Sequence, residues 1–436
     1  MRVRLLQLFV WGIVLFSALV AHANPGAQLF QGPGGMPVYL LESSVNPMVE
    51  IRIYARGGSV YDPAGKSGVA SLTAWMFNEG GGEWDAATFQ ERLEFHGILM
   101  DATAGLESMV VKLTTLSEHL EEAWARLADA LLRPRLEAKD FARAVAEQKA
   151  LILKERQQPQ TQAALVLQRL LYGNHPYGAP VQGTLESLSR IRLEDIRRFH
   201  ADTFHGPEMV LVVAGDVGRS RLQGLLDRHL ADLRGEPGPR AAVPPVEGVS
   251  AKAAKTRHLE MDLPQTTLLL GAIGIHRRDP DYYAVYVLNQ ILGGAGLTSR
   301  LSMEIRERRG LTYGVYSRFS PLSREGPFVV AMKTKTESTG EALALLRQEL
   351  QRVAREGVAE LELQEVVHYL TGSFPLHLDG LGKLAVTWGT IGFYQLGDDY
   401  LERWPERIRA VTREDIQRVA QRLLDLDRFC TVTVGK

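Results

Sequence analysis

The residues most often used for metal and acid–base chemistry are scattered along this chain. It has 11 histidines and one cysteine, Cys430. No two histidines stand four residues apart with a carboxylate beside them, the pattern by which one helix holds a metal ion. His200 and His205 are five residues apart, and therefore lie on different faces of a helix. The pattern favours surface or core roles for the histidines over metal binding.

Other motifs for catalysis or cofactor binding are missing as well. The sequence contains no G-x-S-x-G elbow, no P-loop and no dinucleotide fingerprint between a strand and a helix. Cys430 cannot form an intramolecular disulfide, and its place in an alternating apolar segment, 429–434, predicts a small buried thiol. The formal net charge is -1, so no overall field attracts nucleic acid or anionic lipid. Any partner must therefore be recognised locally.

Apolar periodicity predicts alternating pairs of strands and groups of helices in the first half of the chain. The strands are expected at 36–41, 49–55, 99–106 and 109–116, and the helices at 68–78, 86–96, 116–131 and 138–156. Strands in adjacent pairs with helices between them are typical of an α+β fold with mostly antiparallel sheets. A parallel doubly wound sheet is the less favoured alternative.

The second half of the chain repeats the first. The segment RLEDIRR at 192–198 corresponds to TREDIQR at 412–418, and the strand expected at 48–55 corresponds to 267–273. A repeat this long predicts two homologous lobes rather than a solenoid. We place the N-terminal lobe at 24–233, a Pro-, Gly- and Ala-rich linker at 234–256 and the C-terminal lobe at 257–436, and expect the lobes to face each other as a clamshell.

The N-terminus is typical of a secretory signal peptide, residues 1–23. A basic start is followed by an apolar stretch of 16 residues, Leu5 to Val20, and by Ala21-His22-Ala23 with its small flanking residues. The alternative is an uncleaved membrane anchor, but a spanning helix needs about 20 residues. We therefore predict cleavage after Ala23, no membrane association of the mature chain, and a periplasmic location.

Several segments resemble one enzyme family. They include GVA at 68–70 with Met76-Phe77, GTLESL at 183–188, LVVAGDV at 211–217, GGAGLTSRL at 293–301 and RERRGLTY at 306–313. In these motifs, and in its element order from about Met36 to Val434, the chain resembles the pitrilysin/insulinase family of zinc metallopeptidases. The resemblance implies a two-lobed clamshell and a peptide or unfolded polypeptide as substrate.

The resemblance also shows what the chain lacks. Active family members carry an inverted H-x-x-E-H motif on the first helix of lobe one, where two histidines bind zinc and the glutamate activates water. The matching residues here are Ser71-Leu72-Thr73-Ala74-Trp75. A hydroxyl, a methyl group and an indole N–H cannot replace them. The family's third ligand falls near Ala150, with Glu147 and Glu155 about a turn away, so we expect no zinc or other cofactor in this chain.

Arg306 and Tyr313 stand at the spacing found in family members whose second lobe holds substrate beside the zinc. The resemblance implies that Arg306 grips a peptide carbonyl or carboxylate and that Tyr313 stabilises the oxyanion of a tetrahedral intermediate. Residue types alone favour a solvated helix arginine and a strand aromatic. The glycines Gly293, Gly294 and Gly296 are either a flexible connection or a backbone surface that contacts an extended peptide.

These features together predict a catalytically incomplete subunit of an exported peptidase. In some bacterial members of the family one subunit carries the zinc motif and a second, zinc-free subunit supplies the Arg-Tyr pair across the cavity. We expect this chain to be of the second kind, with Arg306 and Tyr313 acting on the zinc site of a homologous partner. The alternative is a non-catalytic peptide-binding or scaffold protein. A self-contained zinc hydrolase with a rearranged site is the least favoured alternative.

Overall fold

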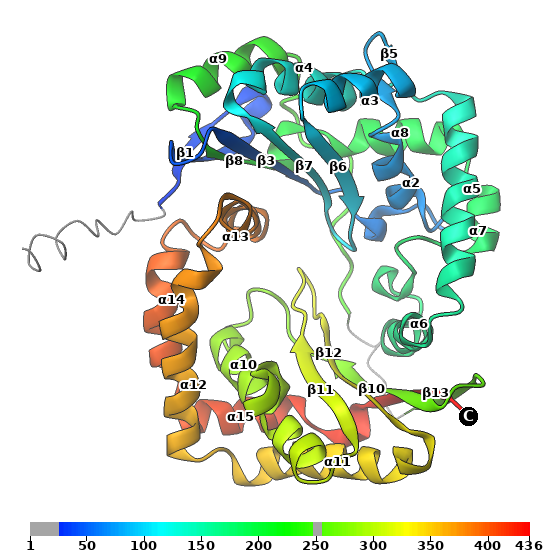
Figure 1. Cartoon of the computed structure of the whole chain (residues 1–436), viewed down its shortest axis with the longest axis vertical. Helices are drawn as coiled ribbons and strands as arrows, with labels where there is room; N and C mark the ends of the chain where they lie inside the picture. The colour runs from blue at the N-terminus through cyan, green and yellow to red at the C-terminus, as the bar shows by residue number, and fades with distance from the viewer. Residues whose placement is uncertain (1–25, 247–254) are drawn as a thin grey trace, which may run out of the picture.

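The computed structural model describes residues 26–246 and 255–436. The predicted signal peptide and the middle of the predicted linker lie outside these residues. Two β-sheets, each packed with helices, occupy opposite ends of the molecule (Figure 1). Within the described residues, no helix combines the length and apolar composition needed to cross a membrane.

The first sheet has six strands in the order β1-β2-β8-β3-β7-β6. They are β1 (Gln28–Gln31), β2 (Pro37–Glu42), β8 (Met209–Gly215), β3 (Met48–Ala55), β7 (Met109–Leu116) and β6 (Leu99–Ala104). Only β2 and β8 run parallel. Every residue of β8 is buried, because this almost wholly apolar strand lies inside the sheet with helices over both faces. β6 forms one edge.

The second sheet repeats this order as β11-β12-β10-β13-β9. Its strands are β11 (Thr312–Phe319), β12 (Pro327–Lys335), β10 (Gln265–Ile273), β13 (Cys430–Gly435) and β9 (Thr256–Glu260), and again only the last pair is parallel. In the first half the final strand, β8, lies between β2 and β3, and in the second half the final strand, β13, lies between β9 and β10. β1 has no counterpart in the second sheet. The shared order agrees with the duplication expected from the sequence, and both sheets are mostly antiparallel as predicted.

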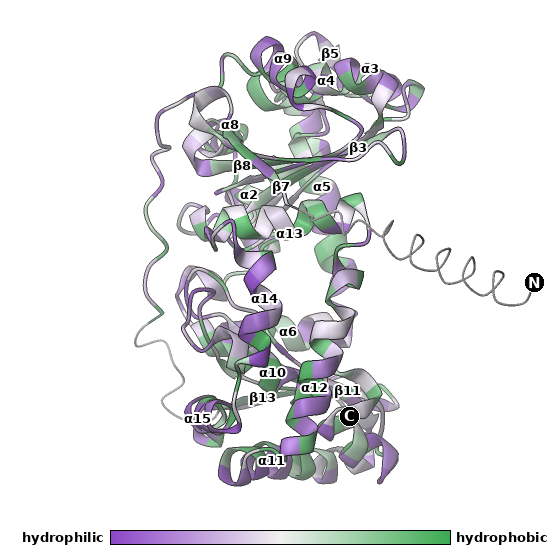
Figure 2. Ribbon diagram, turned by 90° about the vertical axis from the view of Figure 1, so that its left-hand side faces the viewer, coloured by the Kyte–Doolittle hydropathy of each residue, from purple (hydrophilic) through white to green (hydrophobic). Residues whose placement is uncertain are grey.

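Eight α-helices form in the described residues of the first half, and the first four lie where periodicity predicts them. They are α2 (Val69–Met76), α3 (Ala86–Phe95), α4 (Leu120–Leu132), α5 (Ala138–Glu155), α6 (Pro159–Tyr172), α7 (Leu185–Arg190), α8 (Leu193–Thr203) and α9 (Arg219–His229). Those of the second half are α10 (Tyr282–Asn289), α11 (Thr339–Glu356), α12 (Glu360–Ser373), α13 (Leu381–Tyr394), α14 (Tyr400–Arg409) and α15 (Arg413–Leu423). Figure 2 shows hydrophobic residues along the central strands and many hydrophilic residues on α12 and α14.

Each sheet has its inner face covered by a helix from the opposite half of the chain. α13 packs on β8 and β3 of the first sheet, and α6 packs on β10 and β13 of the second (Figure 1). Glycine is needed at Gly389 of α13 for this helix to lie so close to β3, because a Cβ there would lie 2.0 Å from the Tyr54 ring. The exchange merges apolar residues of both halves into common cores, which fixes the two sheets relative to each other.

A buried carboxylate joins the two halves where α13 ends. Glu107, in the β6–β7 connection, is 4% exposed and accepts hydrogen bonds from the Ser323 backbone N–H at 3.0 Å and from the Tyr394 hydroxyl at 3.0 Å. The hydroxyl of Tyr177 donates to the same carboxylate. Because its donors come from both halves, Glu107 ties the two lobes together.

Candidate functional site

The three positions at which the resemblance places a zinc motif line a cavity of about 740 Å³ in the first lobe. Ser71, Ala74 and Trp75 share one face of α2, which packs against α5, α8 and β6. All the lining residues come from the first half of the chain: Ser71, Ala74, Trp75, Asn78, Asp101, Ala102, Thr103, Ala104, Glu155, Thr161, Leu165, Gln168, Pro180, Val181 and Gln182. The helix that would hold zinc in an active relative therefore borders an open, largely apolar hollow.

Gln148 on α5 is the residue that contacts the motif. Its Oε1 accepts a hydrogen bond from the Ser71 hydroxyl at 3.2 Å, and its Nε2 donates to the Gln182 carbonyl at 2.7 Å. Gln148 is 1% exposed, whereas Ala150 and Glu147 are exposed. The resemblance places the third position near Ala150, and Gln148, two residues earlier, is the buried α5 residue whose side chain hydrogen bonds to Ser71.

Trp75 is used structurally. Its indole hydrogen bonds to the Glu79 carboxylate, which also forms an ion pair with Arg143. Burial raises the pKa of Glu79, while Arg143 acts in the opposite direction. The Trp75 N–H therefore stabilises the turn that follows the C-terminal end of α2.

The side chains around the cavity do not fit a zinc ion. Within the described parts of the chain, no three His, Cys, Asp or Glu side chains are grouped as metal ligands. The two carboxylates of the lining have other partners: Asp101 Oδ1 accepts from Asn78 at 3.4 Å, and Glu155 Oε1 accepts from Gln182 at 3.3 Å. A neutral amide, a hydroxyl and a methyl group stand where a zinc site needs charged or imidazole ligands. The cavity therefore offers no means of activating water through a metal.

Strand β6 gives this cavity a surface suited to an extended peptide. Residues 101–104 of β6 line the cavity, and β6 is the outermost strand of its sheet. The outer side of an edge strand presents backbone N–H and C=O groups that can pair with another chain. The sequence predicted the strand, but strand order, which depends on long-range pairing, was needed to identify the edge.

Arg306 and Tyr313 lie at the corresponding edge of the second sheet. Arg306 belongs to a short π-type helix, Ser302–Glu307, that packs against β11, the edge strand on which Tyr313 lies. The register shifts between Thr312 and Val315, and Tyr313 is 89% exposed. The Arg306 guanidinium lies 3.0 Å from the Glu307 carboxylate. The structure thus brings both predicted residues to one edge, separate from the α2 cavity lining.

The predicted glycines lie beside the same strand. Gly293 ends the π-type helix Gln290–Gly294 and is buried against β11, where a Cβ would lie 2.4 Å from the Ser317 backbone nitrogen. Gly294 and Gly296 are exposed, and Gly296 has a φ of +61°. Gly293 therefore serves close packing, and Gly294 and Gly296 are the two that a peptide could reach.

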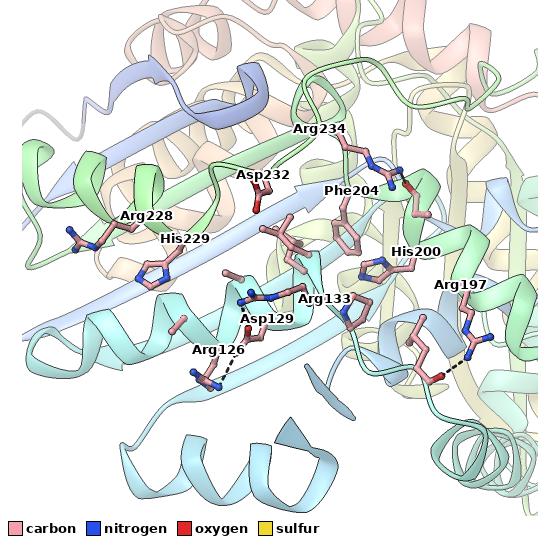
Figure 3. A pocket seen from close by; sticks show the side chains of 17 residues that line it. Arg126, Asp129, Arg133, Arg197, His200, Phe204, Arg228, His229, Asp232 and Arg234 are labelled. Carbon is pink, nitrogen blue, oxygen red and sulfur yellow. Dashed lines mark hydrogen bonds and ion pairs between the residues drawn. The ribbon is translucent and has the colours of Figure 1, made fainter. Parts of the chain in front are cut away.

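A second cavity, of about 840 Å³, lies between α4, α8 and the segment after α9 (Figure 3). Four of its five arginines have acidic partners; for example, Arg133 lies 2.6 Å from Asp129, and Arg228 lies 2.8 Å from Glu121. Complete burial lowers the pKa of His200, which lines this cavity, to about 4. These paired charges and a neutral histidine indicate a structural role.

Comparison with known proteins identifies relatives for both halves of the chain. Residues 38–185 match the family model described as insulinase (peptidase family M16), and residues 190–370 match the model described as peptidase M16 inactive domain. A Helicobacter pylori protein named non-peptidase homolog YmxG is 28% identical over 385 residues, covering 88% of this chain and 87% of the relative.

Two solved structures are similar over nearly the whole chain. A peptidase M16 inactive domain from Pseudomonas fluorescens is 31% identical with a TM-score of 0.87, covering 94% of this chain and 98% of that one. A protein described as a protease from Helicobacter pylori is 18% identical with a TM-score of 0.84, covering 94% and 100%. At 18% identity, the similarity to the Helicobacter pylori structure shows a shared fold only.

Proposed function

This chain belongs to the M16 (insulinase) peptidase family, and we propose that within the family it is a zinc-free subunit that completes the active site of a zinc-binding homologue. The proposed reaction is hydrolysis of peptide bonds in unfolded polypeptide. The partner supplies the metal and the water-activating glutamate, and this chain supplies Arg306 and Tyr313.

The exposure of Tyr313 is the observation that carries this proposal. An aromatic side chain 89% exposed on an edge strand gains almost nothing from burial in its own fold. Its hydroxyl has no hydrogen-bond partner among the described residues, so it is available to a substrate held against β11. A tyrosine hydroxyl in that position can stabilise a developing oxyanion.

The α2 helix supports the same division of labour. Ser71 hydrogen bonds to Gln148 and Trp75 to Glu79, so both side chains have partners within this chain's own fold. Two relatives also carry descriptions of lost activity, "non-peptidase homolog" and "inactive domain". The predicted signal peptide adds a periplasmic location for the proposed complex.

Mixing purified chains tests the proposal. The partner to use is an exported M16 chain from the same organism that has an intact H-x-x-E-H helix. We expect neither chain alone to cleave a quenched peptide at an appreciable rate, and the mixture to form a one-to-one complex that does. Full activity of the partner alone, or activity of this chain alone, would contradict the proposal.

A second candidate function is peptide binding without catalysis, favoured by the cavity beside edge strand β6. In that case the isolated chain binds an unfolded peptide and no partner gains activity from it. Fluorescence anisotropy with a labelled unfolded peptide distinguishes the two. Substituting Thr103 with proline would block an added strand at the edge of β6 and is expected to weaken this binding.

A further inference from the structure

A cavity of about 370 Å³ at the junction of the two lobes has a strongly basic lining. Arg56 comes from the first half, and the second half provides the others. The charged and titratable members are Arg56, His276, Arg277, Arg278, Arg324 and Glu325. Four guanidinium groups therefore share one small hollow with a single carboxylate.

The duplicated topology explains why these residues meet. Arg56 directly follows β3, and residues 276–278 follow β10, the counterpart of β3 in the second sheet. The segments that follow these two equivalent strands therefore each contribute arginine to the cavity. Arg324 lies in the β11–β12 connection. The preceding residue, Ser323, donates a backbone hydrogen bond to Glu107, which lies in the equivalent β6–β7 connection of the first sheet.

Most of these arginines have no acidic partner. Among the described residues, no carboxylate lies within 4 Å of the guanidinium nitrogens of Arg277, Arg278 or Arg324, and only Arg56 has one, Glu208 at 3.3 Å. Neutral oxygens accept their hydrogen bonds instead. Arg278 donates to the Tyr394 carbonyl at 3.1 Å and Arg324 to the Val243 carbonyl at 2.9 Å. The arginines of Figure 3 contrast with these, because carboxylates neutralise several of them.

Arg277 is the clearest example of a guanidinium group without a carboxylate partner. Its guanidinium lies 4.2 Å from the centroid of the Tyr282 ring and donates to the Tyr400 hydroxyl at 3.1 Å. Its Nε is buried and has no hydrogen-bond partner within the described chain. The nearby Glu107 carboxylate is already occupied by Tyr177, Tyr394 and the Ser323 N–H. Like charges held together in a partly desolvated hollow repel one another unless an anion offsets them.

We propose that this cavity binds a small molecule carrying two or more oxyanion groups, either phosphates or carboxylates. Guanidinium groups bind both kinds of oxyanion through paired N–H donors. The volume suits a small ligand and is too small to enclose a folded partner or a nucleic acid duplex. A ligand bound there bridges Arg56 of one lobe to Arg277, Arg278 and Arg324 of the other, and so stabilises the junction. The inference is independent of the proposed peptidase role.

Calorimetric titration of the full mature chain tests this site. Tripolyphosphate represents the phosphate source and citrate the carboxylate source, each at ionic strength matched with sodium chloride. We expect at least one of them to bind with one-to-one stoichiometry and to raise the midpoint of thermal unfolding. The comparison between the two identifies the source. Binding of neither probe to the wild-type chain overturns the proposal.

Arginine variants locate the binding. Arg278→Gln and Arg324→Gln each remove a charge-assisted contact and are expected to weaken binding by about tenfold or more. Arg278→Lys keeps the charge and should retain part of the affinity. The matched control is Arg133→Gln, because the Arg133 side chain is 71% exposed and borders the other cavity. The unfolding midpoint without ligand shows whether each variant is folded. Equal binding by wild type and both cavity variants, or an equal loss in Arg133→Gln, would refute the assignment.

Discussion

At the residue scale, Ser71, Ala74 and Trp75 stand where the resemblance places a zinc motif, and we infer that Gln148 marks the position of the third ligand. The Ser71–Gln148 hydrogen bond places an amide where the helix facing the motif would need a charged ligand. Zinc in catalytic sites takes three protein ligands, and an amide oxygen is a poor one. Restoring the motif on α2 alone should therefore leave the site incomplete.

We predict that the variant Ser71→His, Ala74→Glu, Trp75→His binds zinc weakly, and that adding Gln148→Glu tightens binding by about tenfold or more. The measurement is zinc stoichiometry and affinity after dialysis. Adding Glu147→Gln, on the exposed side of α5, is the control and should change nothing. Tight, stoichiometric zinc in the three-residue variant would contradict the position assigned to Gln148.

His200 makes a second prediction at this scale, because complete burial lowers its pKa from 6.5 to about 4. The unfolded chain binds the proton more tightly than the folded chain. Stability is therefore full above about pH 6.5 and is lost as the pH falls toward 4. Between pH 7.5 and pH 5 the loss from this group should be about 2 kcal/mol.

Denaturant unfolding of wild type and His200→Gln across this pH range measures the effect. Glutamine keeps an N–H that can donate to the Ala130 carbonyl, as His200 Nε2 does at 3.3 Å. The variant should lose stability less steeply on acidification. Parallel curves for the two proteins would show that His200 is not the group responsible.

At the element scale, the π-type helix Gln290–Gly294 packs closely against β11. A Cβ at Gly293 would lie 2.4 Å from the Ser317 nitrogen, so helix and strand can approach only with glycine there. We predict that Gly293→Ala lowers the free energy of unfolding by about 1–3 kcal/mol. Gly314→Ala, which meets nothing within 4 Å, is the control for chemical denaturation. An equal effect of the two substitutions would contradict the packing role.

Four strands and four helices of the first half could be predicted from the sequence, because helices such as α5 and strands such as β7 depend on local periodicity. The start of α4 was predicted wrongly at Leu116, since that residue ends β7 and continues an apolar pattern into the helix. The contact between Gln148 and Ser71 was not expected, because a count along the sequence ignores which face of α5 is buried. The edge position of β6 and the exchange of α6 and α13 depend on long-range packing, which periodicity does not encode.

At the scale of the whole molecule, Glu107 couples the lobes. Its carboxylate accepts from Tyr177 in the first half and from Tyr394 and Ser323 in the second. We predict that Glu107→Gln lowers the free energy of unfolding by about 2 kcal/mol, because an amide replaces a buried charged acceptor. Thermal unfolding and limited proteolysis between the lobes measure the effect. Glu341→Gln, at an exposed position of α11, is the control, and an equal response of both variants would contradict the coupling.

In the proposed function, the whole molecule supplies one half of a catalytic site. The first lobe retains the cavity without metal ligands, and the second presents Arg306 and Tyr313 on an exposed edge. In the proposed complex, the duplicated fold of this chain faces the same fold in its partner. Substitutions of β11 side chains should then lower the peptidase activity of the partner's site without preventing assembly of the complex.

The most direct test is kcat/KM for a quenched peptide in the reconstituted complex with Tyr313→Phe. Loss of one oxyanion donor is expected to lower the rate by about a hundredfold, and Arg306→Ala should also weaken turnover. Tyr316→Phe and Arg308→Ala, exposed neighbours on the same strand and helical segment, are the controls and should remain near wild type. Undiminished kcat/KM in both Tyr313→Phe and Arg306→Ala, with the complex still formed, would contradict a catalytic contribution from this chain.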